Sequence, residues 1–460
     1  MNHANRRPAV IALIAMTVGF AGAVARADAP KQLAQNGSGA TITIATVNNP
    51  QMIDMEHLTP EFTKETGIKV NYVTLPENGV REKITSDVAT GGGQFDLATV
   101  GTYEVPIWAK NKWIVDLKPS FAKLSPSDSK AYDLNDVLPQ VKKALTYQND
   151  LYAVPFYGES SMMFYNKRTF AAAHLTMPLH PTWAQVAKFA DKLTDKNANK
   201  YGIVLRGLPG WGEMGAPLTT VINTYGGSWF DMQWNPQLTA PATKKAVNFY
   251  IDLLRRDGPP GAQSNGFTEC ETVFAQNHGA MWVDATSAAG LITDPKNSKV
   301  ASDVGFAFAP TDVTPKGSHW LWAWSLAIES SSKNKDAAFR FLQWSTSKKY
   351  IALVAKTRGW ANVPPGTRMS TFAAPGYKQA APYGSIILSS IQSADPTDAT
   401  LHKVPYTGVQ YVGIPEFQGI GTRVTQDLAA TLNGSQSVDA ALQLAQQQTE
   451  RTMREAGYLK

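Results

Sequence analysis

Residues 41–100 alternate between two hydrophobic periods, one typical of strands and the other of helices. Runs rich in β-branched residues predict strands at 41–47, 68–74 and 95–100. Between these runs, apolar residues recur at three- and four-residue steps, which predicts helices at 51–66 and around 80–88. Gly67 and the glycines at 91–93 stand where these helices should end. Strands that are joined through helices pair in parallel, so this segment is predicted to be an α/β unit.

The same alternation returns further along the chain. Strands are predicted at 201–205, 280–283, 304–308 and 321–328, and helices at 243–256, 337–345 and 438–454. The 460 residues are more than one core normally holds, because single hydrophobic cores rarely grow past ~250–300 residues. The sequence therefore predicts two α/β lobes with a cleft between them.

The first 27 residues have the order of features that marks a secretory signal peptide. Arg6 and Arg7 precede an apolar stretch over 9–24, and small residues suited to cleavage follow it. We expect cleavage after Ala27, a flexible leader at 28–39, and an exported protein. The alternative is a membrane anchor, but the apolar stretch is shorter than the ~20 residues that span a bilayer.

Cysteine content and charge narrow the class of protein further. Cys270 is the only cysteine, so neither an intrachain disulfide nor a cysteine-based metal site can form. The formal net charge of +6 falls to +3 without residues 1–27, which contain three arginines and no acids. That charge is too small to predict nucleic acid or an anionic membrane as a partner.

Motifs that carry catalysis are missing from the sequence. It contains no G-x-S-x-G elbow, no H-E-x-x-H helix and no phosphate-binding loop with its lysine. The seven histidines are scattered without ligand spacing, so we expect no metal site and no cofactor. These features favour a binding protein over an enzyme.

Several segments, read here as loops, combine aromatic residues with carboxylates, amides or arginine. Some follow predicted strands, at the edge where open α/β sheets bind ligands. Carboxylates accept hydroxyl protons, arginine donates from a fixed fork, and a Trp face covers C–H groups, so the set suits a polyhydroxylated ligand. The segments are residues 48–50, 101–104, 155–160, 206, 210–213, 282–286, 320–324 and 358–362.

Each of these residues also has a structural alternative. Arg206 fits a ligand clamp or a structural salt bridge. Trp320, Trp322 and Trp324 share one side of a strand, so one can face the cleft while others pack. Asp284, directly after a buried strand, is the hardest to explain without a partner.

Longer stretches resemble the sorbitol/mannitol-binding proteins of bacterial ABC transporters, within the wider family that includes maltose-binding proteins. The likeness extends from about residue 41 to residue 458, and its blocks follow in the same order. Those blocks are residues 87–96, 155–160, 320–324, 358–366 and 404–408. The residues at 270–271 and 277–278 differ from the family's usual sequence, just before the strand that leads to Asp284.

The resemblance implies a type II periplasmic-binding-protein fold, with two α/β lobes that each hold a mixed sheet flanked by helices. The first lobe would contain residues 40–150 and 285–330, and the second residues 151–284 and 331–460. It also implies a periplasmic monomer that closes around a sugar alcohol of the sorbitol, mannitol or arabitol type. Its partners would be the permease subunits of an ABC importer.

The same resemblance implies which side chains face the ligand. The first set is Asn49, Tyr103, Glu159, Arg206, Trp211, Asp284, Trp322 and Arg358. A second, less direct set is Glu77, Tyr157, Glu213 and Trp360. No residue is expected to be catalytic.

Three other functions stay open at the level of the sequence. An exported carbohydrate-active hydrolase could use Glu159 and Asp284 as a carboxylate pair. The cleft could instead hold a mono- or disaccharide, because the residue types suit any sugar. A solute receptor that signals through a membrane sensor would carry the same features.

Overall fold

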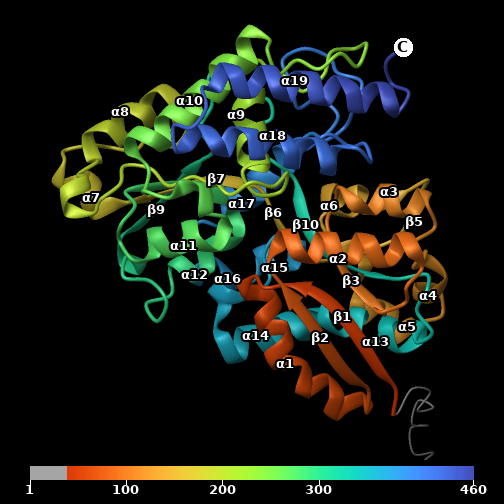
Figure 1. Cartoon of the computed structure of the whole chain (residues 1–460). Coiled ribbons are helices and arrows are strands. Elements are labelled where there is room, and N and C mark those ends of the chain that lie inside the picture. The colour runs from red at the N-terminus through yellow and green to blue at the C-terminus, as the bar shows by residue number, and fades with distance from the viewer. Residues whose placement is uncertain (1–38) are drawn as a thin grey trace, which may run out of the picture. The chain divides into compact units, whose positions relative to one another are not determined.

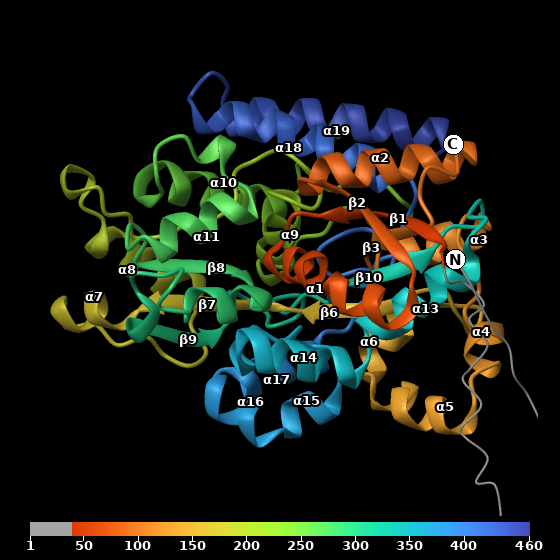
Figure 2. The same cartoon turned by 90° about the horizontal axis from the view of Figure 1, so that it is seen from below.

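The computed structural model describes residues 39–460, so the predicted signal peptide and all but the last residue of the predicted leader lie outside the described residues. Over residues 39–460 the chain forms two larger β-sheets surrounded by helices (Figures 1 and 2). Within this range, none of the helices has the length and apolar character needed to cross a membrane.

The first sheet is mixed and has the strand order β2-β1-β3-β10-β6. Its strands are β1 (Thr41–Val47), β2 (Lys69–Leu75), β3 (Leu97–Val100), β10 (Trp322–Ile328) and β6 (Val154–Glu159). β1 pairs in parallel with β2 and β3, whereas β10 runs antiparallel to β3 and β6. The strands predicted from β-branched runs are thereby confirmed close to their predicted bounds.

The helices that connect these first strands lie on opposite faces of the sheet. α1 (Pro50–Thr66) joins β1 to β2, and α2 (Glu77–Thr90) joins β2 to β3 on the far side of β1. Right-handed crossovers in opposite directions place their helices on opposite faces, as Figure 2 shows. Gly67 and Gly91 end the two helices with φ of 72° and 65°, which glycine adopts without strain.

The second sheet has the order β8-β7-β9 and is antiparallel in its named strands. They are β7 (Ser161–Asn166), β8 (Met281–Ala285) and β9 (Val304–Phe308). The strand predicted at 201–205 is wrong, since this segment forms isolated parallel bridges to β8 and the residues before it. The Ile203 N–H, which would donate to the neighbouring strand in a continuous ladder, bonds to the Asp257 carbonyl (3.4 Å) instead.

The chain passes from the first sheet to the second at Ser160, between β6 and β7. The loop predicted at 155–160 is wrong, because this segment forms the buried edge strand β6. Pro155 is tolerated there because an edge strand can lack an N–H and the register shifts beside it. The predicted lobe boundaries put β6 in the second lobe and β9 in the first, whereas the strand pairing puts β6 in the first sheet and β9 in the second.

Helices make up most of the remaining chain. α10 (Pro241–Asp257), α13 (Lys335–Ser345) and α19 (Val438–Glu455) confirm the three later helix predictions. α13 packs beside α1, where the rings of Phe62 and Phe341 meet edge to face at 5.1 Å. α19 lies alongside α18 (Figures 1 and 2). The other α-helices are α3 (Glu104–Lys110), α4 (Lys118–Ala122), α5 (Pro126–Tyr132), α6 (Pro139–Ala144), α7 (Lys167–Ala172), α8 (Trp183–Leu193), α9 (Gly215–Thr224), α11 (Phe267–Ala275), α12 (Ala289–Ile292), α14 (Lys348–Arg358), α15 (Met369–Ala373), α16 (Pro375–Ala380), α17 (Gly384–Ser393) and α18 (Phe417–Leu432), and a short hairpin joins β4 (Thr146–Tyr147) to β5 (Asp150–Leu151).

Candidate functional site

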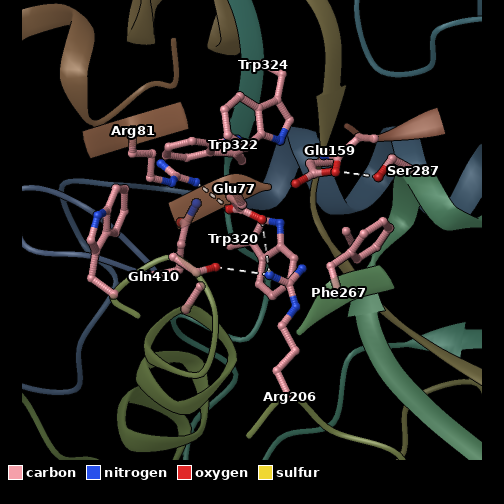
Figure 3. Close-up of a pocket in the computed structure, with 15 residues that line it drawn as sticks. Glu77, Arg81, Glu159, Arg206, Phe267, Ser287, Trp320, Trp322, Trp324 and Gln410 are labelled. Carbon is pink, nitrogen blue, oxygen red and sulfur yellow. Dashed lines mark hydrogen bonds and ion pairs between the residues drawn. The ribbon is translucent and has the colours of Figure 1, made fainter. Parts of the chain in front are cut away.

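A pocket lies where elements of the two sheets meet (Figure 3). α2 and the ends of β6 and β10 line it from the first sheet, and the start of α11 and the segment after β8 line it from the second. The empty space among the lining atoms is about 410 Å³. That space is counted out to solvent, so it measures the pocket together with its mouth.

Arg81 forms the charged wall that α2 presents to the pocket. Its guanidinium bonds to Glu77, one helical turn earlier, and to Glu104 at 2.9 Å. Glu104 is held in turn by the N–H of Gly101 (3.0 Å). Burial acts to lower the pKa of Arg81, but the nearby carboxylates of Glu77 and Glu104 raise it above its usual value. Arg81 therefore keeps its positive charge although it is buried.

Arg206 faces this wall from the other side of the pocket. Its Nε and Nη2 donate to the two carboxylate oxygens of Asp284, at 2.9 Å and 2.6 Å. Its Nη1 lies 3.4 Å from Glu213 and 3.9 Å from Glu77. Burial opposes the charge of Arg206, but Asp284 raises its pKa well above the usual value. The Glu77 carboxylate thus lies between two guanidinium groups, as Figure 3 shows.

Glu159 brings a carboxyl group of different character to the pocket. It ends β6, and its Oε2 accepts a hydrogen bond from the Ser287 hydroxyl (2.5 Å). Burial raises the pKa of Glu159 to about 8. At pH 7 the group is therefore mostly protonated, and a protonated carboxyl can both donate and accept a hydrogen bond.

Three tryptophan rings pack around Arg81 and form the apolar wall of the pocket. The Arg81 Cζ lies 4.3, 4.9 and 4.7 Å from the ring centroids of Trp211, Trp322 and Trp324. Trp322 and Trp324 reach the same side because they are two residues apart on β10. Cation–π contacts contribute ~0.5–2 kcal/mol each, so the rings help to fix the guanidinium in place.

Four lining side chains carry buried polar atoms that have no hydrogen-bond partner within residues 39–460. They are Arg81 Nε, Trp211 Nε1, Trp320 Nε1 and Gln410 Oε1. The Gln410 amide cannot turn over, because its Nε2 donates to the Leu321 carbonyl (3.1 Å) and a flip would bring two oxygens together. Buried polar groups are normally paired, so three donors and one fixed acceptor here call for a polar partner.

The structure brings six of the residues predicted to face the ligand together around this pocket. They are Asn49, Glu77, Glu159, Arg206, Trp211 and Trp322. Four others lie buried directly behind a lining residue. Tyr157 accepts a hydrogen bond from the Asn49 amide (2.7 Å), and the Tyr103 ring lies tilted against Trp211 (4.6 Å between ring centroids). Asp284 and Glu213 hold Arg206, so the strand-end carboxylate Asp284 orients an arginine and does not line the pocket.

Arg358 and Trp360 lie outside this pocket. Arg358 forms an ion pair with Asp54 (2.9 Å) and lines a neighbouring compartment. The Trp360 ring lies against Gly376. The block at 358–362 was expected to face the ligand because of its resemblance to the family. Nothing in its sequence shows whether its side chains line the pocket or lie outside it.

Sequence reasoning missed several lining residues. Arg81 could have been found, because it stands four residues after Glu77 on a helix that follows a strand. Ser287 directly follows the segment 282–286, whereas Phe267 lies between predicted elements, and both belong to residue types that are not specific to binding sites. Gln410 reaches the pocket from a loop far along the chain, and nothing local in the sequence marks it.

The chain has two helix-flanked β-sheets, and elements of both line a pocket of charged and aromatic side chains. This combination is typical of a class of ligand-binding proteins. The chain belongs to the bacterial extracellular solute-binding protein family, whose sequence model matches residues 49–352. Among solved structures, maltose-bound MalE3 of T. maritima shares the fold, with a TM-score of 0.74 at 17% identity over 90% of this chain and all of that one.

More similar relatives are named for sugar alcohols. A mannitol-binding protein of Pseudomonas aeruginosa is 47% identical over 421 residues, which cover 91% of this chain and 94% of that protein. A solved ABC-transporter solute-binding protein of Agrobacterium vitis with bound D-mannitol is 52% identical, with a TM-score of 0.89, over 92% of this chain and 100% of that one. Another such protein from Agrobacterium radiobacter, in complex with ribitol, is 26% identical with a TM-score of 0.79. The match covers 90% of this chain and 99% of that one. The resemblance and the type II periplasmic-binding-protein fold expected from the sequence are confirmed.

Proposed function

We propose that this chain is the substrate-binding component of an ABC importer for a sugar alcohol. It binds D-mannitol, or a related hexitol or pentitol, in the pocket and delivers it to the membrane permease. We place the protein in the periplasm, as a monomer. The mannitol-binding protein of P. aeruginosa and the two alditol-bound structures support this ligand class.

The observation that carries the proposal is the set of unpaired polar atoms at Arg81, Trp211, Trp320 and Gln410. Each hydroxyl of an alditol donates one hydrogen bond and accepts others, so it can pair with both kinds of unpaired atom. Hydrogen bonds from a guanidinium or to a carboxylate are stronger than neutral ones. The tryptophan faces can cover the C–H groups of the ligand and exclude water from these bonds.

The pocket does not present the carboxylate pair that the sequence offered for glycoside hydrolysis. A hydrolase needs two carboxyl groups that reach the substrate, and the sequence offers Glu159 and Asp284. Both oxygens of Asp284 are bonded to Arg206, and they also accept from Trp282 Nε1 (3.1 Å) and the Ala285 N–H (2.7 Å). Asp284 is also completely buried, which leaves it unable to attack a substrate in the pocket.

We also propose that the two sheets are the cores of two lobes that close on the ligand. Two of the connections between them lie side by side, since the Thr286 N–H donates to the Ser160 carbonyl (2.8 Å). A pair of adjacent crossings can act as a hinge. With the strand pairing and the packing of α13 on α1 taken into account, β6 and α13 belong to the first lobe and β9 to the second.

A thermal-stability screen tests the assignment. The protein is heated alone and with D-mannitol, D-glucitol, D-arabitol, D-glucose or maltose. A bound alditol at ~100 times its dissociation constant should stabilise the fold by about 2.7 kcal/mol and raise the melting temperature. Stabilisation by maltose with none by any alditol would contradict the proposal, and release of a new product from any sugar would favour the hydrolase.

A further inference from the structure

A second compartment adjoins the pocket, and the same chain segments line both. At the start of α1, Asn49 lines the pocket and Asn48 lines the compartment. On α11, Phe267 lines the pocket and Glu271, one helical turn later, lines the compartment. Ser287 lines both, and Figure 3 shows it on the same side of the pocket as Phe267. The compartment's empty space, counted out to solvent, is about 1490 Å³.

Glu271 is the feature of this compartment that lacks a structural explanation. Only 5% of its surface is exposed, yet its Oε1 has no hydrogen-bond partner in the part of the chain that the structure describes. Burial raises the pKa of Glu271 to about 8, so at pH 7 the carboxyl can both donate and accept. The buried hydroxyl of Tyr377 lines the same compartment and likewise has no partner between residues 39 and 460.

The charges of the compartment suit a neutral occupant. Its arginine, Arg358, is already paired with Asp54 (2.9 Å). The exposed Lys296 adds one positive charge, and the half-exposed Asp294 adds one negative charge. A phosphate or carboxylate group would therefore find little net attraction there, whereas the hydroxyls of a neutral sugar would pair with Glu271 and Tyr377.

We propose that this compartment is a second subsite, which binds the hexosyl unit of an alditol that is glycosylated at a terminal hydroxyl. The inference rests on the proposed function, because the alditol part occupies the inner pocket. Ser287, which donates to Glu159 and lines both spaces, stands where the two parts of such a ligand join.

Isothermal titration calorimetry of the full protein tests the subsite with two ligands, D-mannitol and 1-O-α-D-glucopyranosyl-D-mannitol. We expect both to bind, the glucoside at least as tightly as mannitol. Glu271→Leu should weaken glucoside binding about tenfold, because a buried hydrogen bond is lost, and leave mannitol binding within about twofold. Glu271→Gln should retain glucoside binding, because an amide also donates and accepts.

Each result decides a separate claim. Mannitol binding without glucoside binding shows that the compartment is only an entrance, and overturns the subsite. An equal loss for both ligands in Glu271→Leu, or no loss for either, overturns the role of Glu271. Failure of wild-type protein to bind mannitol contradicts the proposed function itself. Melting temperatures show whether the variants are folded, and if Glu271→Leu does not fold, the two wild-type titrations decide.

Discussion

Arg206, which lines the ligand pocket, forms an ion pair with Asp284 behind it, and the two side chains are 5% and 0% exposed. Burial of two charges is costly, and the fork-like pairing offsets that cost only while both partners are present. Removing one partner leaves an uncompensated charge in the interior. At the scale of single residues, the site thus depends on Asp284, which holds a lining arginine but does not line the pocket itself.

We expect Asp284→Asn to destabilise the fold by about 3–5 kcal/mol, because the buried Arg206 would lose its nearest counter-charge and keep only the longer approaches of Glu213 and Glu77. Urea unfolding measures this loss. The matched control is Glu65→Gln, which breaks the exposed ion pair with Lys349 (2.7 Å) and should cost no more than ~1 kcal/mol. Equal effects of the two substitutions would show that the buried pair has no special role.

Gln410→Met tests the fixed acceptor of the pocket. Methionine has a similar length but cannot present the amide oxygen, so affinity for D-mannitol should fall about tenfold, or ~1.4 kcal/mol. The melting temperature should change little, because the Leu321 carbonyl still accepts from the Thr102 hydroxyl (3.3 Å). An unaltered titration would remove Gln410 from the binding site.

At the scale of elements, β10 joins the site to a buried carboxyl group. Trp322 and Trp324 line the pocket, and Glu329 follows the strand with 0% of its surface exposed. Burial raises the pKa of Glu329 from 4.5 to about 9, and the neighbouring Asp87 carboxylate adds to this rise. Between those pH values the folded protein holds a proton that the unfolded chain lacks, so stability falls as pH rises from about 5 to about 9.

Glu329→Gln should reduce this pH dependence. Its amide can still donate to Asp87 and carries no titratable proton, so the urea midpoint should decline less between pH 5 and pH 9 than in the wild type. Wild-type and variant proteins keep other carboxyls with raised pKa, such as Glu159 and Glu213, so some decline remains. The control is Glu450→Gln, whose half-exposed carboxylate pairs with Arg454 (2.7 Å). Parallel pH profiles for the variant and this control would contradict the assignment.

The elements also show what the sequence can and cannot predict. β1, α1 and α2 were predictable because their hydrophobic periods are strong and glycines mark their ends. β6 was missed because Pro155 and Gly158 disfavour strands, and only its place at the sheet edge makes them acceptable.

The site was predictable in part for a similar reason. Glu159 lies at the carboxyl end of β6, where open sheets bind ligands, and Trp322 pairs with it at the start of the antiparallel β10. The family resemblance pointed to the same blocks. Asp284 also lies at a strand end, but which neighbour it contacts depends on tertiary packing. The place of Gln410 in the site depends on tertiary packing entirely, because its loop meets the segment before β10 only in the folded chain.

At the scale of the whole molecule, the pocket exists only where elements of both sheets meet. Arg81, on α2 beside the first sheet, packs on Trp211 from the part of the chain around the second sheet. Arg206 approaches Glu77 of α2 from the same part. A ligand held among these groups would contact both sheets' elements at once, which would couple its binding to the proposed closure. Delivery to a permease requires such a coupling, because the closed form is what distinguishes a loaded protein from an empty one.

Isothermal titration of D-mannitol into the purified protein tests the central claim most directly. We predict saturable binding of one mannitol per chain, with the ligand recovered unchanged afterwards. No saturable binding of D-mannitol, D-glucitol or D-arabitol, or conversion of the ligand to a product, would contradict the account.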